Sequence, residues 1–393
     1  MSDRFEVYRK KINDRISNKR YRELTTTNLF SNESCKYVFR GETRLLNFCS
    51  NDYLGFSLNP EIINAAKDYT QLYGTGSRSS RLVSGNLFCH QELELILSAF
   101  LGAENALVFN TGYQGNISII SALCDKNSVI YADKLAHNSL LQGCLLSGAK
   151  LHRFKHNDMN HLEQLLKKNE GNSQQLIVSE SVFSMDGDIA PLDALCELAE
   201  KYNTLLLIDD AHAVGVLGEQ GKGLAFGKKR IDFVTGTFGK SLGSLGGYVL
   251  CSKEMKHFFV NFAAGFIYTT GIQPGTAGAV LEGLKRLSYL DDEREKLVDL
   301  SNELRNGLHE LGYDTCNSKS QIVPMLIGRD EDALLLADYL MKEGIYAAAI
   351  RPPTVPEGKA RIRFSLTVHH ELEDIEILLH AISRFKKNDK TSG

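Results

Sequence analysis

LLLIDDAHAVG, residues 205–215, joins an apolar run to two consecutive carboxylates and a histidine. Such a continuous run is typical of a strand that is buried on both faces of a parallel sheet. Asp209 and Asp210 then fall at the carboxyl end of the strand, where open α/β sheets bind their ligands. A buried carboxylate needs a partner, and a protonated heterocyclic nitrogen would suit it. A helix N-cap is the alternative, more for Asp210 than for Asp209.

Similar apolar runs occur on both sides of this segment. The predicted strands are 106–110, 128–133, 175–180, 204–210, 232–237 and 247–252. Amphipathic stretches predicted as helices, such as 90–102 and 192–203, separate most of them. This alternation predicts an α/β fold with a central, mostly parallel sheet.

Three regions differ in their pattern. Residues 1–45 are polar and basic and predict a helical arm followed by a short hairpin, and residues 46–290 form the large domain. Residues 291–393 predict a small C-terminal α+β domain. Its predicted helices are 291–312, 331–343 and 371–387, and its predicted strands are 322–328, 345–351 and 360–366.

The composition is that of an ordinary globular protein. Of the 393 residues, 43% are hydrophobic and 24% are charged, which excludes disorder for most of the chain. A net charge of −3 gives no indication of a nucleic-acid partner. No apolar run approaches the ~18 residues of a membrane span. The eight cysteines contain no CxxC pair, and the N-terminus has no apolar signal core, so we expect reduced thiols in a cytoplasmic protein.

Two stretches resemble known motifs but lack a required residue. TFGKSLGS (237–244) contains Gly-Lys-Ser, but Val234 stands where a P-loop needs its first glycine. HHELED (369–374) places Asp374 where a zinc protease has its second histidine. We therefore expect no metal site.

Three further features follow predicted strands. Lys240 lies in the glycine-rich turn of TGTFGKSLGSLGG (235–247), NTGYQGN (110–116) opens a predicted helix at 114–123, and His137 lies in ADKLAHNSL (132–140). Taken singly, they could be a surface lysine, a helix cap and a polar histidine. Together with Asp209 they predict a pyridoxal phosphate site, in which the carboxylate holds the ring nitrogen, the lysine bonds the aldehyde and the helix start holds the phosphate.

The chain resembles the α-oxoamine synthases of the fold-type I pyridoxal phosphate transferases, from about Leu46 to the last helix. The stretches that carry the resemblance are SNDYLGF (50–56), GTGSRSSRLVSG (74–85), NTGYQGN (110–116), ESVFSMDGDIAPL (180–192), DDAHAVGVLGEQGKG (209–223), TFGKSLGSLGGY (237–248) and IRPPTVPEGKARIRFSL (350–366). So many motifs in one order make this match specific.

The resemblance implies a role for each matching cofactor residue. Lys240 would bind the cofactor covalently and act as the base, Asp209 would pair with the ring nitrogen, and His137 would stack on the ring. The remaining cofactor contacts would be His212 and Ser184 at the ring oxygen, Gly112 and Tyr113 at the phosphate, Thr237 beside the lysine turn, and Thr270 at the phosphate of a partner subunit. Glu180 would support the site from behind.

The resemblance also implies the substrate contacts. Arg351 would hold the amino-acid carboxylate, with Thr354 beside it, and Asn51 would lie near the substrate. Arg20 and Arg22 are both candidates for the far carboxylate of a long acyl chain, and Arg22 is the one we assign.

IRPPTVP together with NDYLG is most similar to members that condense L-alanine with a pimeloyl thioester in biotin biosynthesis. Members that use glycine or serine with another acyl-CoA share every cofactor residue, so that alternative stays open. An ordinary aminotransferase and a cofactor-free scaffold are two further hypotheses outside this group. The acyl carrier could be coenzyme A or a carrier protein, and the resemblance implies a homodimer.

Overall fold

The computed structural model of the chain describes residues 3–30, 32–169, 171 and 174–391, and it divides into two compact units. The large unit contains residues 51–184 and 188–296. The small unit contains residues 1–50, 185–187 and 297–393, so the N-terminal arm groups with the C-terminal region.

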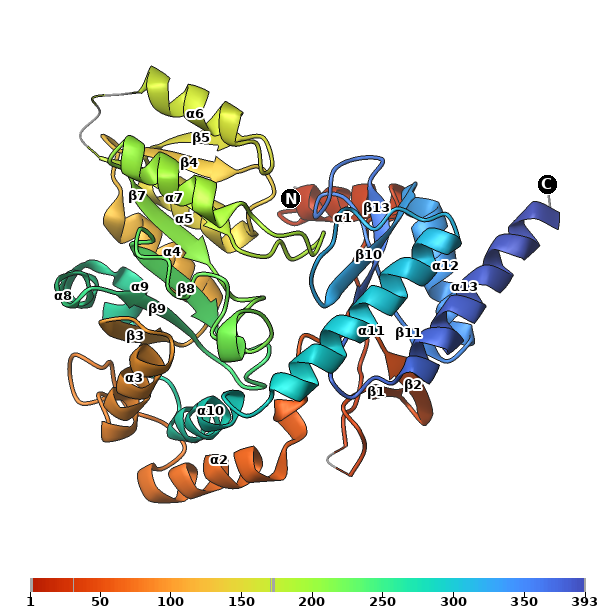
Figure 1. Cartoon of the computed structure of the whole chain (residues 1–393), viewed down its shortest axis with the longest axis horizontal. Helices are drawn as coiled ribbons and strands as arrows, with labels where there is room; N and C mark the ends of the chain where they lie inside the picture. The colour runs from red at the N-terminus through yellow and green to blue at the C-terminus, as the bar shows by residue number, and fades with distance from the viewer. Residues whose placement is uncertain (1–2, 31, 170, 172–173, 392–393) are drawn as a thin grey trace. The chain divides into compact units, whose positions relative to one another are not determined.

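A seven-stranded sheet forms the centre of the large unit, in the order β3-β9-β8-β7-β6-β4-β5 (Figure 1). Its strands are β3 (Asn105–Phe109), β4 (Val129–Asp133), β5 (Lys150–Phe154), β6 (Gln175–Glu180), β7 (Leu205–Asp209), β8 (Phe233–Thr237) and β9 (Gly247–Cys251). Strands β8, β7, β6, β4 and β5 run parallel, whereas β9 is antiparallel to both of its neighbours. The α/β prediction with a mostly parallel sheet is confirmed.

Helices cover both faces of this sheet, because successive strand residues point to opposite sides. Ile130 and Ala132 of β4 pack into one apolar core with α4 (Gly112–Leu123), α5 (Asn138–Ser147) and α8 (Lys253–Phe262). Val129 and Tyr131 pack into the other core, with α6 (Met159–Lys168) and α7 (Leu192–Lys201). The large unit also contains α2 (Pro60–Tyr73), α3 (Phe88–Phe100), α9 (Ala264–Ile267), α10 (Pro274–Leu287), η1 (Phe56–Leu58) and η2 (Glu219–Gly221).

The small unit contains two three-stranded sheets, β1-β2-β11 and β10-β13-β12. Their strands are β1 (Tyr37–Arg40), β2 (Thr43–Asn47), β10 (Ile322–Gly328), β11 (Ile345–Tyr346), β12 (Ala348–Ile350) and β13 (Ala360–Ser365). Its helices are α1 (Glu6–Ser17), α12 (Asp330–Lys342) and α13 (Leu372–Thr391), and α11 (Asp291–Glu310) begins in the large unit and continues into the small one.

The predicted helical arm and hairpin at the N-terminus are α1 and β1–β2. The prediction of one strand over 345–351 is wrong, because β11 pairs with β2 in one sheet and β12 pairs with β13 in the other. All eight cysteines are free. Among the described residues, no helix is long and apolar enough to cross a membrane.

Candidate active site

Asp209 is the last residue of β7 and lies in register with Glu180 of β6 and Thr235 of β8. Its carboxylate is buried, with only 8% of the residue exposed. Oδ2 accepts a hydrogen bond from Asn116 Nδ2 at 2.7 Å, and Oδ1 accepts from the Ala211 amide at 3.0 Å. Both donors are neutral, so they hold the carboxylate in place without neutralising its charge.

The adjacent Asp210 serves a different purpose. Its carboxylate accepts from the backbone amides of Leu224 at 3.4 Å and Ala225 at 3.2 Å, and these amides belong to a loop rather than to a helix N-terminus. Burial raises the pKa of Asp210 to about 7. The N-cap alternative therefore describes neither aspartate.

His137 and Glu180 form the neighbouring part of the site. His137 precedes α5, its backbone amide donates to Glu180 Oε1 at 2.6 Å, and its Nδ1 lies 2.7 Å from Ser139 Oγ. Burial raises the pKa of Glu180 well above its ordinary range, and the Asp209 charge adds to this. Burial lowers the pKa of His137. These shifts favour the protonated form of Glu180 and the neutral imidazole of His137.

Lys240 occupies the turn between β8 and β9, where its carbonyl accepts from the Gly243 amide at 2.8 Å. Besides burial, the Asp209 carboxylate raises the pKa of His137 and the Lys240 ammonium lowers it. The same two charges act in opposite directions on the pKa of Glu180. Lys240, Asp209 and His137 therefore share one electrostatic environment.

His212 follows β7 and joins a second polar group. The Tyr53 hydroxyl lies 2.7 Å from His212 Nδ1 and donates to Asn51 Oδ1 at 3.2 Å. Tyr53 is fully buried. These hydrogen bonds hold the imidazole of His212 and connect it to Asn51 through the Tyr53 hydroxyl. Ser184 lies in the segment after β6, between the bridged residues Val182 and Ile189.

The N-terminus of α4 is packed tightly against β8 and β9. A Cβ atom at Gly112 would lie 3.2 Å from Thr237 Cβ, and one at Gly247 would lie 2.4 Å from Gly112 Cα. Thr111 caps the helix by accepting from the Gln114 amide at 3.0 Å. Glycine at these positions lets the backbone approach closely and leaves a helix N-terminus of the kind that binds phosphate.

Tyr113 and Thr270 lie on the borders of this region. The Tyr113 hydroxyl donates to Asn138 Oδ1 at 2.9 Å, and its ring lies 6.4 Å from that of His137. Thr270 forms an isolated bridge with Ser80, and its carbonyl accepts from Asn110 Nδ2 at 2.9 Å.

The remaining predicted substrate residues belong to the small unit. Arg22 donates to Thr354 Oγ1 at 3.2 Å, and Arg351 donates to the carbonyl of Lys19. Arg20 forms ion pairs with Glu357 at 2.6 Å and Asp330 at 3.5 Å. The structure thus brings Arg22 and Thr354 together and gives Arg20 acidic partners within the chain.

Sequence reasoning did not single out Asn116, Ser139 or Tyr53. Asn116 donates to Ser139 Oγ at 2.9 Å as well as to Asp209, and it is buried on a helix whose other buried side chains are mostly apolar. A polar amide side chain on the apolar side of a predicted helix could have indicated this residue, because a buried amide must have polar partners. Tyr53 lies within the quoted SNDYLGF stretch, but its partner His212 is 159 residues away.

The residues of the large unit fit pyridoxal phosphate. A buried carboxylate held by neutral donors suits a protonated ring nitrogen, and the charges of this carboxylate and of Lys240 both act on the pKa of His137. The tight packing of Gly112 against Thr237 forms a cradle that a larger side chain would fill. These groups are of the kinds that would hold the ring nitrogen, the aldehyde and the phosphate of this cofactor.

Comparison with known proteins gives a consistent result. The aminotransferase class I and II family profile matches residues 43–382. A putative 8-amino-7-oxononanoate synthase from Desulfosudis oleivorans is 46% identical over 88% of this chain and 90% of its own. The 8-amino-7-oxononanoate synthase from Geobacter sulfurreducens is 42% identical over 93% and 94%.

A solved serine palmitoyltransferase from S. paucimobilis, with bound PLP and myriocin, has a TM-score of 0.90 at 28% identity and covers 97% of this chain and 96% of that one. The predicted resemblance and the fold-type I architecture are confirmed. The chain belongs to the aminotransferase class I and II family, in the group that contains the 8-amino-7-oxononanoate synthases.

Proposed function

We propose that this enzyme uses pyridoxal phosphate to condense L-alanine with a pimeloyl thioester, giving 8-amino-7-oxononanoate, carbon dioxide and the free thiol carrier. The observation that carries this proposal is the buried Asp209 carboxylate beside His137 and Lys240, in a chain 42–46% identical to relatives named for this activity. Coenzyme A and a carrier protein are both compatible with this site.

Pyridoxal phosphate, when bound, supplies an electron sink for the negative charge that develops at the α-carbon of the amino acid. Asp209 would keep the ring nitrogen protonated, and its fixed neutral donors would hold it there. The neutral imidazole of His137 would lie on the ring face. The N-terminus of α4, at Gly112 and Tyr113, would hold the phosphate, with Thr237 beside it.

Lys240 would first bond the cofactor aldehyde and then, once alanine displaces it, remove the α-proton as general base. Arg351, with Thr354, would bind the alanine carboxylate, and Arg22 the far carboxylate of the pimeloyl chain. His212 and Ser184 would donate to the ring oxygen, with Asn51 near the substrate. In the net reaction a carbon–carbon bond forms at the thioester carbonyl, the carbon–sulfur bond breaks, and the alanine carboxylate leaves as carbon dioxide.

We further propose a cytoplasmic homodimer in which Thr270 reaches the phosphate bound by the partner subunit. Large apolar side chains that are exposed on the single chain support this, among them Val83 at 79% and Tyr268 at 84%. They flank the Ser80–Thr270 bridge, so the same surface would bring Thr270 to the partner.

A related synthase that uses glycine or serine is the second candidate, since a serine palmitoyltransferase shares the fold at a TM-score of 0.90. The 28% identity of that protein, against 42–46% for the relatives named above, favours alanine and pimeloyl thioester.

The test is a matrix of assays on purified protein loaded with pyridoxal phosphate. L-Alanine, glycine and L-serine are each combined with pimeloyl-CoA, pimeloyl carrier protein, acetyl-CoA and palmitoyl-CoA, and products are identified by mass spectrometry. We expect 8-amino-7-oxononanoate from alanine with one or both pimeloyl thioesters. Turnover only with glycine or serine would overturn the substrate, and amino transfer to a keto acid without acyl transfer would overturn the reaction class.

A further inference from the structure

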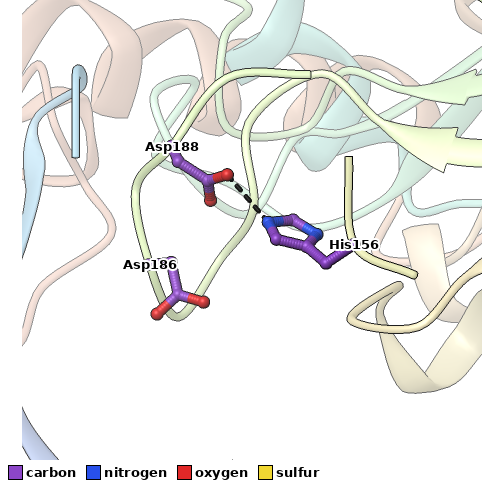
Figure 2. A group of neighbouring side chains, drawn as sticks. All are labelled: His156, Asp186 and Asp188. Atoms are coloured by element: carbon purple, nitrogen blue, oxygen red, sulfur yellow. Dashed lines mark hydrogen bonds and ion pairs between the residues drawn. The ribbon is translucent and has the colours of Figure 1, made fainter. Parts of the chain in front are cut away.

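A histidine outside the proposed cofactor contacts lies between two carboxylates. His156 follows β5, and its Nδ1 is 2.9 Å from Asp133 Oδ1 while its Nε2 is 2.8 Å from Asp188 Oδ2. Figure 2 shows the imidazole turned toward Asp188. Asp133 is completely buried, and its ring partner His156 packs edge-on against Phe183 with centroids 4.4 Å apart.

This geometry determines the protonation state of the ring. An ionised carboxylate only accepts hydrogen bonds, so both ring nitrogens must donate, and only the imidazolium form has two N–H groups. Burial favours the neutral ring, but the two aspartates outweigh it and raise the pKa of His156 to about 9. The group carries one positive charge between two negative ones at neutral pH.

The Asp133 carboxylate is connected to His137 through a short turn of the chain. Asp133 ends β4, and its Oδ1 also accepts from the Leu135 amide at 2.7 Å while its carbonyl accepts from the Ala136 amide at 3.1 Å. The next residue is His137, whose amide is bound by Glu180. The short turn that presents the His137 ring is therefore anchored at Asp133.

Asp188, which carries the second carboxylate, is connected through backbone hydrogen bonds to the turn of Ser184 and to Asp209. The Asp188 carbonyl accepts from the Phe183 amide at 3.0 Å, which closes the turn that contains Ser184. At the base of that turn the Ser181 amide donates to the Asp209 carbonyl at 2.9 Å. The turn before His137 and the turn that contains Ser184 are about 50 residues apart in sequence. Both are thus connected to the imidazole ring of His156.

We infer that His156 is a positioning residue of the cofactor site, and that its imidazolium fixes the turns of His137 and Ser184 by bridging Asp133 and Asp188. This role rests on the proposed function. It predicts that loss of the bridge weakens cofactor binding without unfolding the chain, because Asn157 makes a second, neutral link. The Asn157 amide donates to Asp133 Oδ2 at 3.0 Å, and its Nδ2 donates to Asp188 Oδ2 at 2.8 Å.

The bridge also predicts a pH dependence. The carboxylates hydrogen-bonded to His156 are Asp133 of β4 and Asp188 of the turn after β6, and its other hydrogen-bond and ring contacts, Asn157 and Phe183, do not titrate. A third carboxylate, Asp186, lies in the same group of side chains (Figure 2) and forms an ion pair with Arg361. Because the folded-state pKa lies above the ordinary value of 6.5, the stabilisation is complete below about 6.5 and is lost as the pH rises through about 9. Cofactor affinity should fall in the same range.

The test compares wild type, H156Q and the control H257Q, which alters an exposed histidine of α8. Dissociation constants for pyridoxal phosphate are measured by fluorescence titration from pH 7 to 10, and melting temperatures are measured alongside. We expect H156Q to stay folded, to bind the cofactor at least tenfold more weakly at pH 7.5, and to lack the weakening that wild type shows near pH 9. H257Q should behave as wild type.

A second variant covers the case in which H156Q does not fold. D188N leaves the ring one carboxylate, so it should move the alkaline loss of affinity to lower pH. Equal affinities and pH profiles for H156Q and wild type would overturn the role of His156, as would an unshifted midpoint for D188N. A wild-type protein that binds no pyridoxal phosphate would instead overturn the proposed function, and this role with it.

Discussion

Asp209 has a buried charge whose described hydrogen bonds come from neutral groups, an Asn116 amide and the backbone of Ala211. Such a group is preorganised, because it does not need to reorient when a positive charge is placed beside it. The strand pattern predicted the position of this carboxylate. The amide that holds it comes from a helix 93 residues earlier, and no local pattern could pair the two.

Asp209→Asn should lower turnover by ~10²–10³-fold, as removal of other preorganised electrostatic groups does. The amide keeps the size of the side chain and a carbonyl oxygen for the Ala211 amide, so the protein should fold. Steady-state kinetics of wild type, Asp209→Asn and Asp210→Asn measure the loss of turnover. Asp210→Asn is the control, because its carboxyl group binds the backbone of a loop. Asp209→Asn activity within tenfold of wild type would contradict the role.

Lys240→Ala should abolish covalent attachment of pyridoxal phosphate while leaving the other ring and phosphate contacts in place. After borohydride reduction and dialysis, wild type should retain the cofactor by intact mass and the variant should not. Retention of the cofactor mass by the variant would show that another amine forms the bond.

At the scale of single elements, the close approach of β9 to the start of α4 shapes the predicted phosphate cradle. A methyl group at position 247 would meet backbone atoms of Gly112 at 2.4 Å, and backbone cannot yield as a flexible side chain can. The sequence showed a glycine-rich turn here. It could not show which glycine faces which backbone, because that depends on the pairing of β9 with β3 and β8.

Gly247→Ala should therefore cost about 1–3 kcal/mol of stability by overpacking and should weaken cofactor binding. Gly115→Ala is the matched control on α4, since its added methyl group would lie at an ordinary 3.5 Å from the Phe109 ring. Denaturant unfolding and cofactor titration compare the two variants. Equal effects of the two substitutions would argue against a tight cradle.

The elements that sequence patterns predicted best are those buried on both faces. All six strands predicted in the large domain occur within a residue or two of their expected bounds. The edge strand β5 was missed, because KLHRF is mostly polar and is buried fully only at Phe154. An edge strand has one hydrogen-bonded neighbour and less apolar surface to cover, so its pattern is weaker.

For the whole molecule, stability in acid should depend on His370 of the small unit. The residue is fully buried, its ring stacks on Phe48 with centroids 4.5 Å apart, and its Nδ1 accepts from the Thr367 amide at 3.0 Å. Burial lowers the pKa of His370 to about 4 from 6.5. Stability from this neutral ring is thus present above pH 6.5 and is lost as the pH falls toward 4.

His370→Asn should be less stable than wild type at pH 7 but should lose less stability between pH 6.5 and 4. Unfolding free energies from urea titrations across this range give the comparison. Parallel pH profiles for the two proteins would show that His370 does not control the acid limb.

The proposed homodimer can be tested by the mass of the protein in solution. Light scattering should find wild type at twice the mass of one chain, and Tyr268→Asp should shift the population toward one chain by placing a charge among exposed apolar groups. Tyr289→Asp is the control, because both tyrosines are 84% exposed and Tyr289 lies in the turn that follows α10. If both variants remain dimeric, the interface lies elsewhere.

The pairing of β2 with β11 has a consequence for the order of synthesis. Leu46 is synthesised before the large unit's sheet, but its strand partner Ile345 follows almost 300 residues later. Every strand of the large unit's sheet is made between these two events. We expect the large unit to fold before the hairpin of β1 and β2 acquires its third strand, β11. A nascent chain released before residue 345 should therefore have a formed large sheet and a small unit without this strand pairing.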